Sequence, residues 1–66
     1  MNQKNKKMIW YEVDLDIFLF GKETDYIQAC NQEEAEIIAL KRASNKFKCS
    51  INQIEVLCCK KKLYSI

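Results

Sequence analysis

The sequence predicts an α+β fold with its elements in the order β-β-α-β. We expect a three-stranded antiparallel or mixed sheet in the spatial order 2-1-3, with one helix packed on one face. Three observations support this: residues 8–20 alternate with a period of two, residues 31–48 have helical periodicity, and a second alternation starts near residue 53. A hairpin would pair the first two strands, and a right-handed crossover through the helix would place the third strand beside the first. The long first strand is then central, and one helix gives two layers.

The chain has the size and composition of one folded domain. Its 66 residues include 48% hydrophobic and 30% charged side chains, which argues against intrinsic disorder. Residues 1–7 are polar and carry three lysines, so we predict a disordered basic N-terminus there. Residues 8–66 form the single predicted domain.

The first strand is predicted at residues 8–20, where the two faces differ in character. Successive side chains of a strand point to opposite faces. One face is apolar and should belong to the core: Ile9, Tyr11, Val13, Leu15, Ile17 and Leu19. The other face combines three carboxylates with aromatic rings: Trp10, Glu12, Asp14, Asp16, Phe18 and Phe20.

A hairpin and a short second strand should follow. The turn is predicted at Gly21-Lys22-Glu23, because a short glycine-containing segment between two strand-like runs is typical of a hairpin. The second strand is expected at residues 24–30, with Ile27 and Ala29 facing inward and Tyr26 and Gln28 facing outward.

The helix is predicted to begin at Asn31 and to end near Phe47 or Lys48. Asn31 can cap the first turn, and Glu34 lies at the third helical position, as in a capping box. Acidic residues at the start and basic residues toward the end suit the helix dipole. One apolar stripe recurs at spacings of three and four residues, widened by Ile37 and Leu40: Ala35, Ile38, Ala39, Ala43 and Phe47.

The last strand is expected to begin near Gln53. Ile54, Val56 and Cys58 would share one face, alternating with Glu55, Leu57 and Cys59. The lysine triplet at residues 60–62 breaks the pattern, so a bulge or turn is predicted there. Leu63, Tyr64 and Ile66 resume the apolar character, in a possible continuation of the strand.

The composition argues against an enzyme. The chain has no histidine, no proline and one glycine, so it offers neither a general base of the usual kind nor a glycine-rich phosphate loop. We therefore predict a non-enzyme without a cofactor. The four cysteines, Cys30, Cys49, Cys58 and Cys59, lack paired metal-ligand spacing, so we predict four free thiols and no metal. We expect a cytoplasmic protein without a signal peptide or membrane segment.

The candidate site is the face of the sheet that one helix cannot cover. Trp10 and Phe18 are its predicted anchors, Glu12, Asp14 and Asp16 its electrostatic complement, and Tyr26 its rim. Aromatic side chains are enriched among interface anchors, so this face favours a protein partner. The competing interpretation is a solvated surface whose charges are neutralised across strands by Lys60, Lys61 and Lys62.

Two other functions fit the residues. Residues 10–40 carry eight carboxylates and one lysine, whereas residues 41–66 carry seven basic side chains and one glutamate. These basic side chains suit compensation of the helix dipole and solubility, and the alternative is contact with nucleic-acid phosphates. Such binding would be non-specific, since ten of the eleven basic residues of the chain are lysine. The residues proposed for that role are Lys41, Lys46, Lys48, Lys60, Lys61 and Lys62. A structural homodimer joined through the uncovered face is the other alternative.

Residues 26–43, Y-I-Q-A-C-N-Q-E-E-A-E-I-I-A-L-K-R-A, resemble a pattern found in very small phage and mobile-element proteins. That pattern is a short strand, a capped helix starting with E-E-A and a closing strand. The composition, rich in lysine, isoleucine and asparagine, is similar to that of proteins from AT-rich bacteria or their phages. Several such small proteins, anti-CRISPR proteins among them, block host defence by occupying the surface of a partner. The resemblance implies a phage-encoded inhibitor that blocks a host defence complex in the host cytoplasm by occupying its surface. It assigns no role to any residue.

Overall fold

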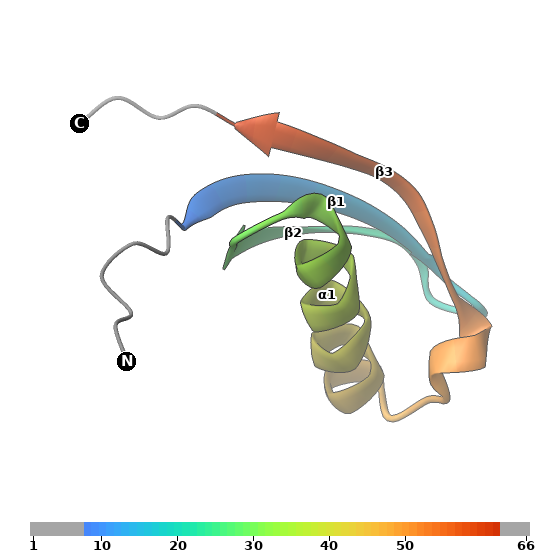
Figure 1. Cartoon of the computed structure of the whole chain (residues 1–66). Coiled ribbons are helices and arrows are strands. Elements are labelled where there is room, and N and C mark those ends of the chain that lie inside the picture. Colours follow the sequence, from blue (N-terminus) through green and yellow to red (C-terminus); the bar gives the residue numbers. More distant parts are fainter. Residues whose placement is uncertain (1–7, 63–66) are drawn as a thin grey trace, which may run out of the picture.

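The structure, a computed structural model, describes residues 8–62 and has the predicted architecture. The elements are β1 (Ile9–Ile17), β2 (Gly21–Ala29), α1 (Gln32–Phe47), the 3₁₀ helix η1 (Ile51–Gln53) and β3 (Ile54–Lys62). The sheet order is β2-β1-β3, and both strand pairings are antiparallel. The predicted α+β class, element order and strand order are confirmed, and α1 lies on one side of the curved sheet (Figure 1). The predictions for residues 1–7 and 63–66 lie outside the described residues.

The core lies between α1 and the inner face of the sheet. β1 contributes the side chains that were predicted to face inward: Tyr11, Val13, Leu15 and Ile17. From β2, Ile27 and Ala29 are buried, also as predicted. The helix contributes only small residues to the buried set, Ala35, Ala39 and Ala43, which allow its backbone to lie close to the strands. Leu40 packs against this core, but Ile37 is exposed, so the predicted apolar stripe is narrower on that side.

Hydrogen bonds fix both ends of α1. The Oδ1 atom of Asn31 accepts a hydrogen bond from the backbone N–H of Glu34 at 2.8 Å. The Glu34 carboxylate accepts one from the N–H of Cys30, also at 2.8 Å, one residue earlier than in a standard capping box. At the other end Lys48 adopts the left-handed conformation, with φ of 55°, and the N–H of Cys49 donates to the carbonyl of Ser44. The predicted helix start and end are confirmed.

The hairpin turn lies earlier than predicted. β1 ends at Ile17, the turn is formed by residues 18–20, and Gly21 is the first residue of β2. The N–H of Phe20 donates to the carbonyl of Ile17 at 2.9 Å and closes the turn. Gly21 serves the hairpin through its φ of 98°, which only glycine adopts easily, and not as the turn centre. Phe18 and Leu19 are therefore turn residues, and Leu19 is exposed instead of facing the core.

The bulge in β3 also differs from the prediction. Leu15 pairs with Val56 and Asp14 pairs with Cys58, so Leu57 has no partner on β1. The extra residue inverts the alternation beyond it, because side chains change faces with every residue. Cys59, opposite Val13, therefore faces the helix, and Cys58 faces the other side, the reverse of the prediction. The lysine triplet continues the strand as far as Lys62.

Candidate protein-binding face

The side of the sheet opposite α1, called the outer face below, forms four rows across the three strands. The central member of each row comes from β1, with a β2 residue on one side and a β3 residue on the other. Along β1, the rows are Gln28-Trp10-Lys62, Tyr26-Glu12-Lys60, Thr24-Asp14-Cys58 and Lys22-Asp16-Glu55. Five of the six residues predicted to bind a partner lie on this face, and Phe18 lies in the turn next to it.

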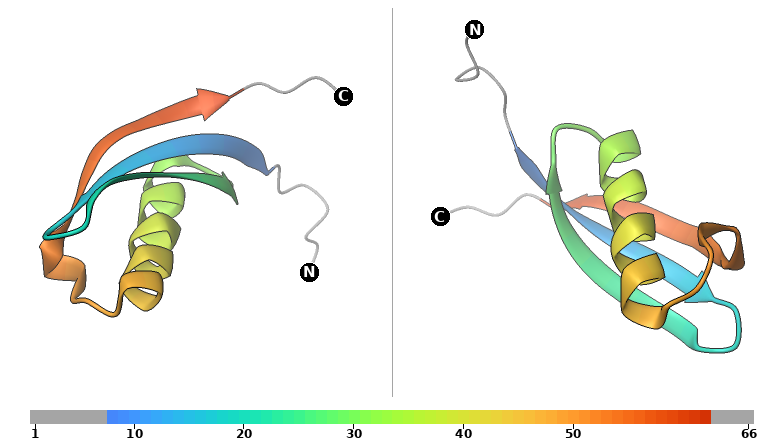
Figure 2. Two further views of the ribbon diagram at one scale, coloured as in Figure 1. Left: turned by 180° about the vertical axis from the view of Figure 1, so that it is seen from behind. Right: turned by 90° about the horizontal axis from the view of Figure 1, so that it is seen from below.

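Nothing within residues 8–62 covers the outer face, since α1 lies on the other side in every view (Figures 1 and 2). Large apolar side chains remain accessible here: Trp10 is 37% exposed, Tyr26 50% and the bulged Leu57 44%. Leu57 was not among the predicted site residues, although alternation from Ile54 placed it on the same face as Glu55.

The carboxylates of the outer face are partly compensated. Glu12 Oε1 lies 2.9 Å from Lys62 Nζ, and Asp14 Oδ1 accepts a hydrogen bond from the Thr24 hydroxyl at 2.8 Å. The Lys62 and Glu12 side chains are only 36% and 19% exposed, so this ion pair is partly shielded from solvent and cancels one charge of each sign on the face. The rows contain four carboxylates and three lysines in all, and the face is therefore less acidic than β1 alone suggested. The competing interpretation was that lysines 60–62 neutralise the carboxylates across strands. The Lys62 contact agrees with it for Glu12, whereas Asp16 forms no ion pair within residues 8–62.

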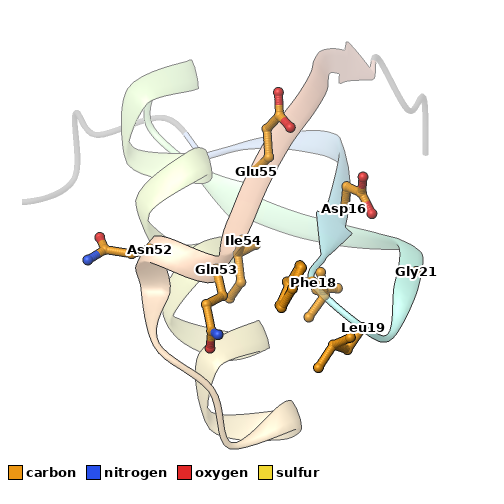
Figure 3. Close-up of a pocket in the computed structure, with 9 residues that line it drawn as sticks. Asp16, Phe18, Leu19, Gly21, Asn52, Gln53, Ile54 and Glu55 are labelled. Atoms are coloured by element: carbon orange, nitrogen blue, oxygen red, sulfur yellow. The ribbon is translucent and has the colours of Figure 1, made fainter.

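The hairpin end of the sheet has a different character. Asp16 lies directly opposite Glu55, and both line a shallow open hollow together with Phe18 and Leu19 (Figure 3). The opposite wall is formed by Asn52 and Gln53 of η1, and the Phe18 N–H donates to the Gln53 carbonyl at 2.9 Å. Phe18 is 60% exposed. This hollow joins apolar surface to two carboxylates at one edge of the outer face.

Alternation did not predict that Leu19 is exposed at this end, and it placed Phe20 on the outer face, whereas the Phe20 ring contacts α1. Leu19 was assigned to the core by alternation, although its side chain is 85% exposed in the structure. Phe20 packs its ring on Phe47 with the centroids 4.9 Å apart. The sequence feature that could have indicated a turn here is the run of three large apolar residues, 18–20, immediately before the only glycine of the chain. Such a run does not fit a strand with one buried face.

The predicted nucleic-acid-binding lysines do not form one patch. Lys41, Lys46 and Lys48 belong to α1 or its cap, whereas Lys60 and Lys62 belong to the outer face on the far side of the sheet. Lys61 pairs with the inward-facing Tyr11 and so lies on the helix side. Two of the six are neutralised, because Lys46 contacts Glu23 at 2.6 Å and Lys62 contacts Glu12.

The cysteines are free thiols and form no metal centre in the described part of the chain. Burial raises the pKa of the Cys59 thiol, and the nearby Glu36 and Cys58 raise it further. This thiol is therefore held in its protonated, less nucleophilic form. Within residues 8–62, no helix is long and apolar enough to cross a membrane.

Comparisons with known proteins place the chain in no family. No protein-family model, no curated protein and no solved structure matches it.

Proposed function

We propose that this protein is a non-catalytic binding module that docks a partner protein on its outer face. The observation that supports this most strongly is the one-sided packing of the sheet, which leaves Trp10, Tyr26 and Leu57 accessible among charged side chains. Covering one large apolar side chain is favourable by about 1.5–3 kcal/mol, so a complementary surface gains by binding here. Buried aromatic anchors with a charged surround are the usual anatomy of such interfaces.

The charges of the outer face favour a different protein over a second copy. Two copies stacked face to face are related by a two-fold axis lying between the sheets. When that axis crosses the strands, or runs along them directly over β1, the central strand of one copy lies over that of the other. Glu12, Asp14 and Asp16 would then meet the same carboxylates of the second copy. Like charges brought together in this way oppose docking.

The narrower interpretation, a phage-encoded inhibitor of a host defence complex in the host cytoplasm, has the sequence resemblance alone as support. It stays a prediction, as does nucleic-acid binding, which the division of the lysines between two sides of the molecule makes less favourable.

The proposal is tested by affinity capture from bacterial extract with immobilised protein and two face variants, Trp10→Ala and Leu57→Ala. Each should weaken binding of the captured partner about tenfold or more, as expected for interface anchors. Ile37→Ala is the matched control, because Ile37 is similarly exposed but belongs to α1. Circular dichroism verifies that each variant is folded. Binding that survives both face variants, or is lost equally in the control, contradicts the proposal.

A further inference from the structure

Two locally unfavourable arrangements lie side by side at the hairpin end of the sheet. One is a leucine in the left-handed backbone region, and the other is a pair of carboxylates opposed across two strands. Proteins retain such local conflicts mainly at functional sites. Both features border the same hollow (Figure 3).

Leu19 has a φ of 76°, a region that large side chains avoid because Cβ approaches the backbone too closely. Packing inside the chain does not compensate for this strain, since the side chain is 85% exposed. The turn around it is nevertheless held firmly, by the hydrogen bonds of Phe18 to Gln53 and of Phe20 to Ile17 and by the ring contact of Phe20 with Phe47. Leu19 is thus a protruding apolar side chain on a preorganised support, which lowers the entropy lost on binding.

Asp16 and Glu55 define the chemistry of the expected ligand. They are register partners on adjacent strands, where like charges are destabilising. Lys22 is the register partner of Asp16 on β2, but neither Asp16 nor Glu55 forms an ion pair among residues 8–62, in contrast to Glu12, Glu23 and Asp25. A cation placed between them would remove the repulsion and gain two charge-assisted contacts.

We propose that the hairpin end docks a basic segment of the partner protein. An arginine or lysine side chain of that segment lies between Asp16 and Glu55, and a neighbouring apolar side chain packs on Phe18 and Leu19. Arginine suits the pair better, because its planar fork can donate to two carboxylates. An anionic membrane is a less suitable ligand for the exposed Phe18 and Leu19, since both carboxylates would then face its anionic headgroups. This inference rests on the proposed function and specifies the partner's chemistry at one end of the binding face.

The test uses nuclear magnetic resonance of the ¹⁵N-labelled chain, titrated with the synthetic peptide acetyl-Leu-Arg-Leu-Arg-amide. We expect shift changes concentrated at residues 16–19 and 52–55, weakened by added salt. The matched peptide has citrulline in place of arginine, so it keeps the shape but loses the charge. Its affinity should be lower by about tenfold or more. Asp16→Asn with Glu55→Gln should cause a similar loss for the arginine peptide. Leu19→Asn, which the backbone tolerates well, should weaken both peptides.

Equal binding of the arginine and citrulline peptides overturns the proposal, as do shift changes located elsewhere or none at millimolar peptide. Binding to phosphatidylserine-containing vesicles through residues 16–19 also overturns it, in favour of a membrane. These results are separable from failure of the proposed function. Partner capture that depends on Trp10 and Leu57 while the peptides fail removes only this inference.

Discussion

Leu19 combines an unfavourable backbone conformation with an exposed side chain. Its backbone conformation is one that glycine and asparagine adopt with little strain. Because its side chain is mostly in solvent, replacing it removes little buried apolar area. The residue therefore weakens the fold slightly and is available for contact with another molecule.

Replacing Leu19 should consequently stabilise the isolated protein. We expect Leu19→Asn to raise the free energy of unfolding by about 0.5–1 kcal/mol, since the strain of a large residue in this region is of that order. Urea denaturation measures the change. Lys48→Gly is the positive control, because Lys48 also has a positive φ, at the helix C-terminus. A clear loss of stability in Leu19→Asn would show that the leucine side chain supports the fold.

We expect Cys59 to make the free energy of unfolding decrease with rising pH in the alkaline range. The pKa of its thiol is raised by burial first and by Glu36 and Cys58 second. In the unfolded chain the thiol loses its proton near its ordinary pKa of about 8.5, while the folded chain keeps it. Unfolding then releases a proton, so the free energy of unfolding falls as the pH rises above that value.

The variant Cys59→Ala should remove this part of the pH dependence. We expect the stability difference between wild type and variant to be constant below about pH 8 and to shrink above it, because only the wild type is destabilised by alkali at this position. Urea denaturation at a series of pH values gives the difference. A constant difference across the whole range would mean that the thiol titrates alike in both states.

The helix is the element whose packing is most sensitive to side-chain size. Its fully buried residues are all alanines, and they bring α1 close to the β1 side chains Val13 and Leu15. The ion pairs of Arg42 with Asp25 and Lys46 with Glu23 join the helix to β2 at the margin of this contact. In both pairs the basic side chain is more than half exposed, so each pair contributes about 0–1 kcal/mol. Apolar packing, by the alanines together with Ile38, Leu40 and Phe47, therefore dominates the attachment of the helix.

Enlarging the central alanine should separate the two layers. Ala39→Leu is expected to lower the free energy of unfolding by about 1–3 kcal/mol, the usual cost of overpacking a filled core. Ile37→Leu, on the exposed side of the same helix, should change it little. Thermal denaturation of both variants makes the comparison. A neutral Ala39→Leu would reveal unfilled space between α1 and the sheet.

At the scale of the whole molecule, one-sided packing and charge decide how the chain associates. A chain of 66 residues hides only about 60% of the surface that its unfolded form exposes, so additional burial on binding is favourable. Glu12, Asp14 and Asp16 on β1 oppose the stacking of two copies, so we expect this burial to come from a different protein and not from self-association.

We therefore expect a monomer in solution. Sedimentation velocity should give the mass of one 7.8 kDa chain across the accessible concentration range, at low and at physiological salt. Physiological salt is the stricter condition, because it screens the repulsion between like faces that low salt strengthens. A concentration-dependent dimer that Trp10→Lys dissociates would contradict this expectation and assign the outer face to self-association.

The sequence by itself determined the elements, their order and the inward face of β1, because local periodicity, capping residues and topology rules all act over short stretches of chain. It also placed Trp10, Glu12, Asp14 and Asp16 on one surface, since strand alternation is a local property. The tertiary structure alone decided the turn at residues 18–20 and the bulge at Leu57. Both depend on how two strands align, and one inserted residue exchanges inward and outward side chains without leaving a mark in the local pattern. For the same reason the opposition of Asp16 to Glu55 and the exposure of Leu19 became visible only once the strands were paired.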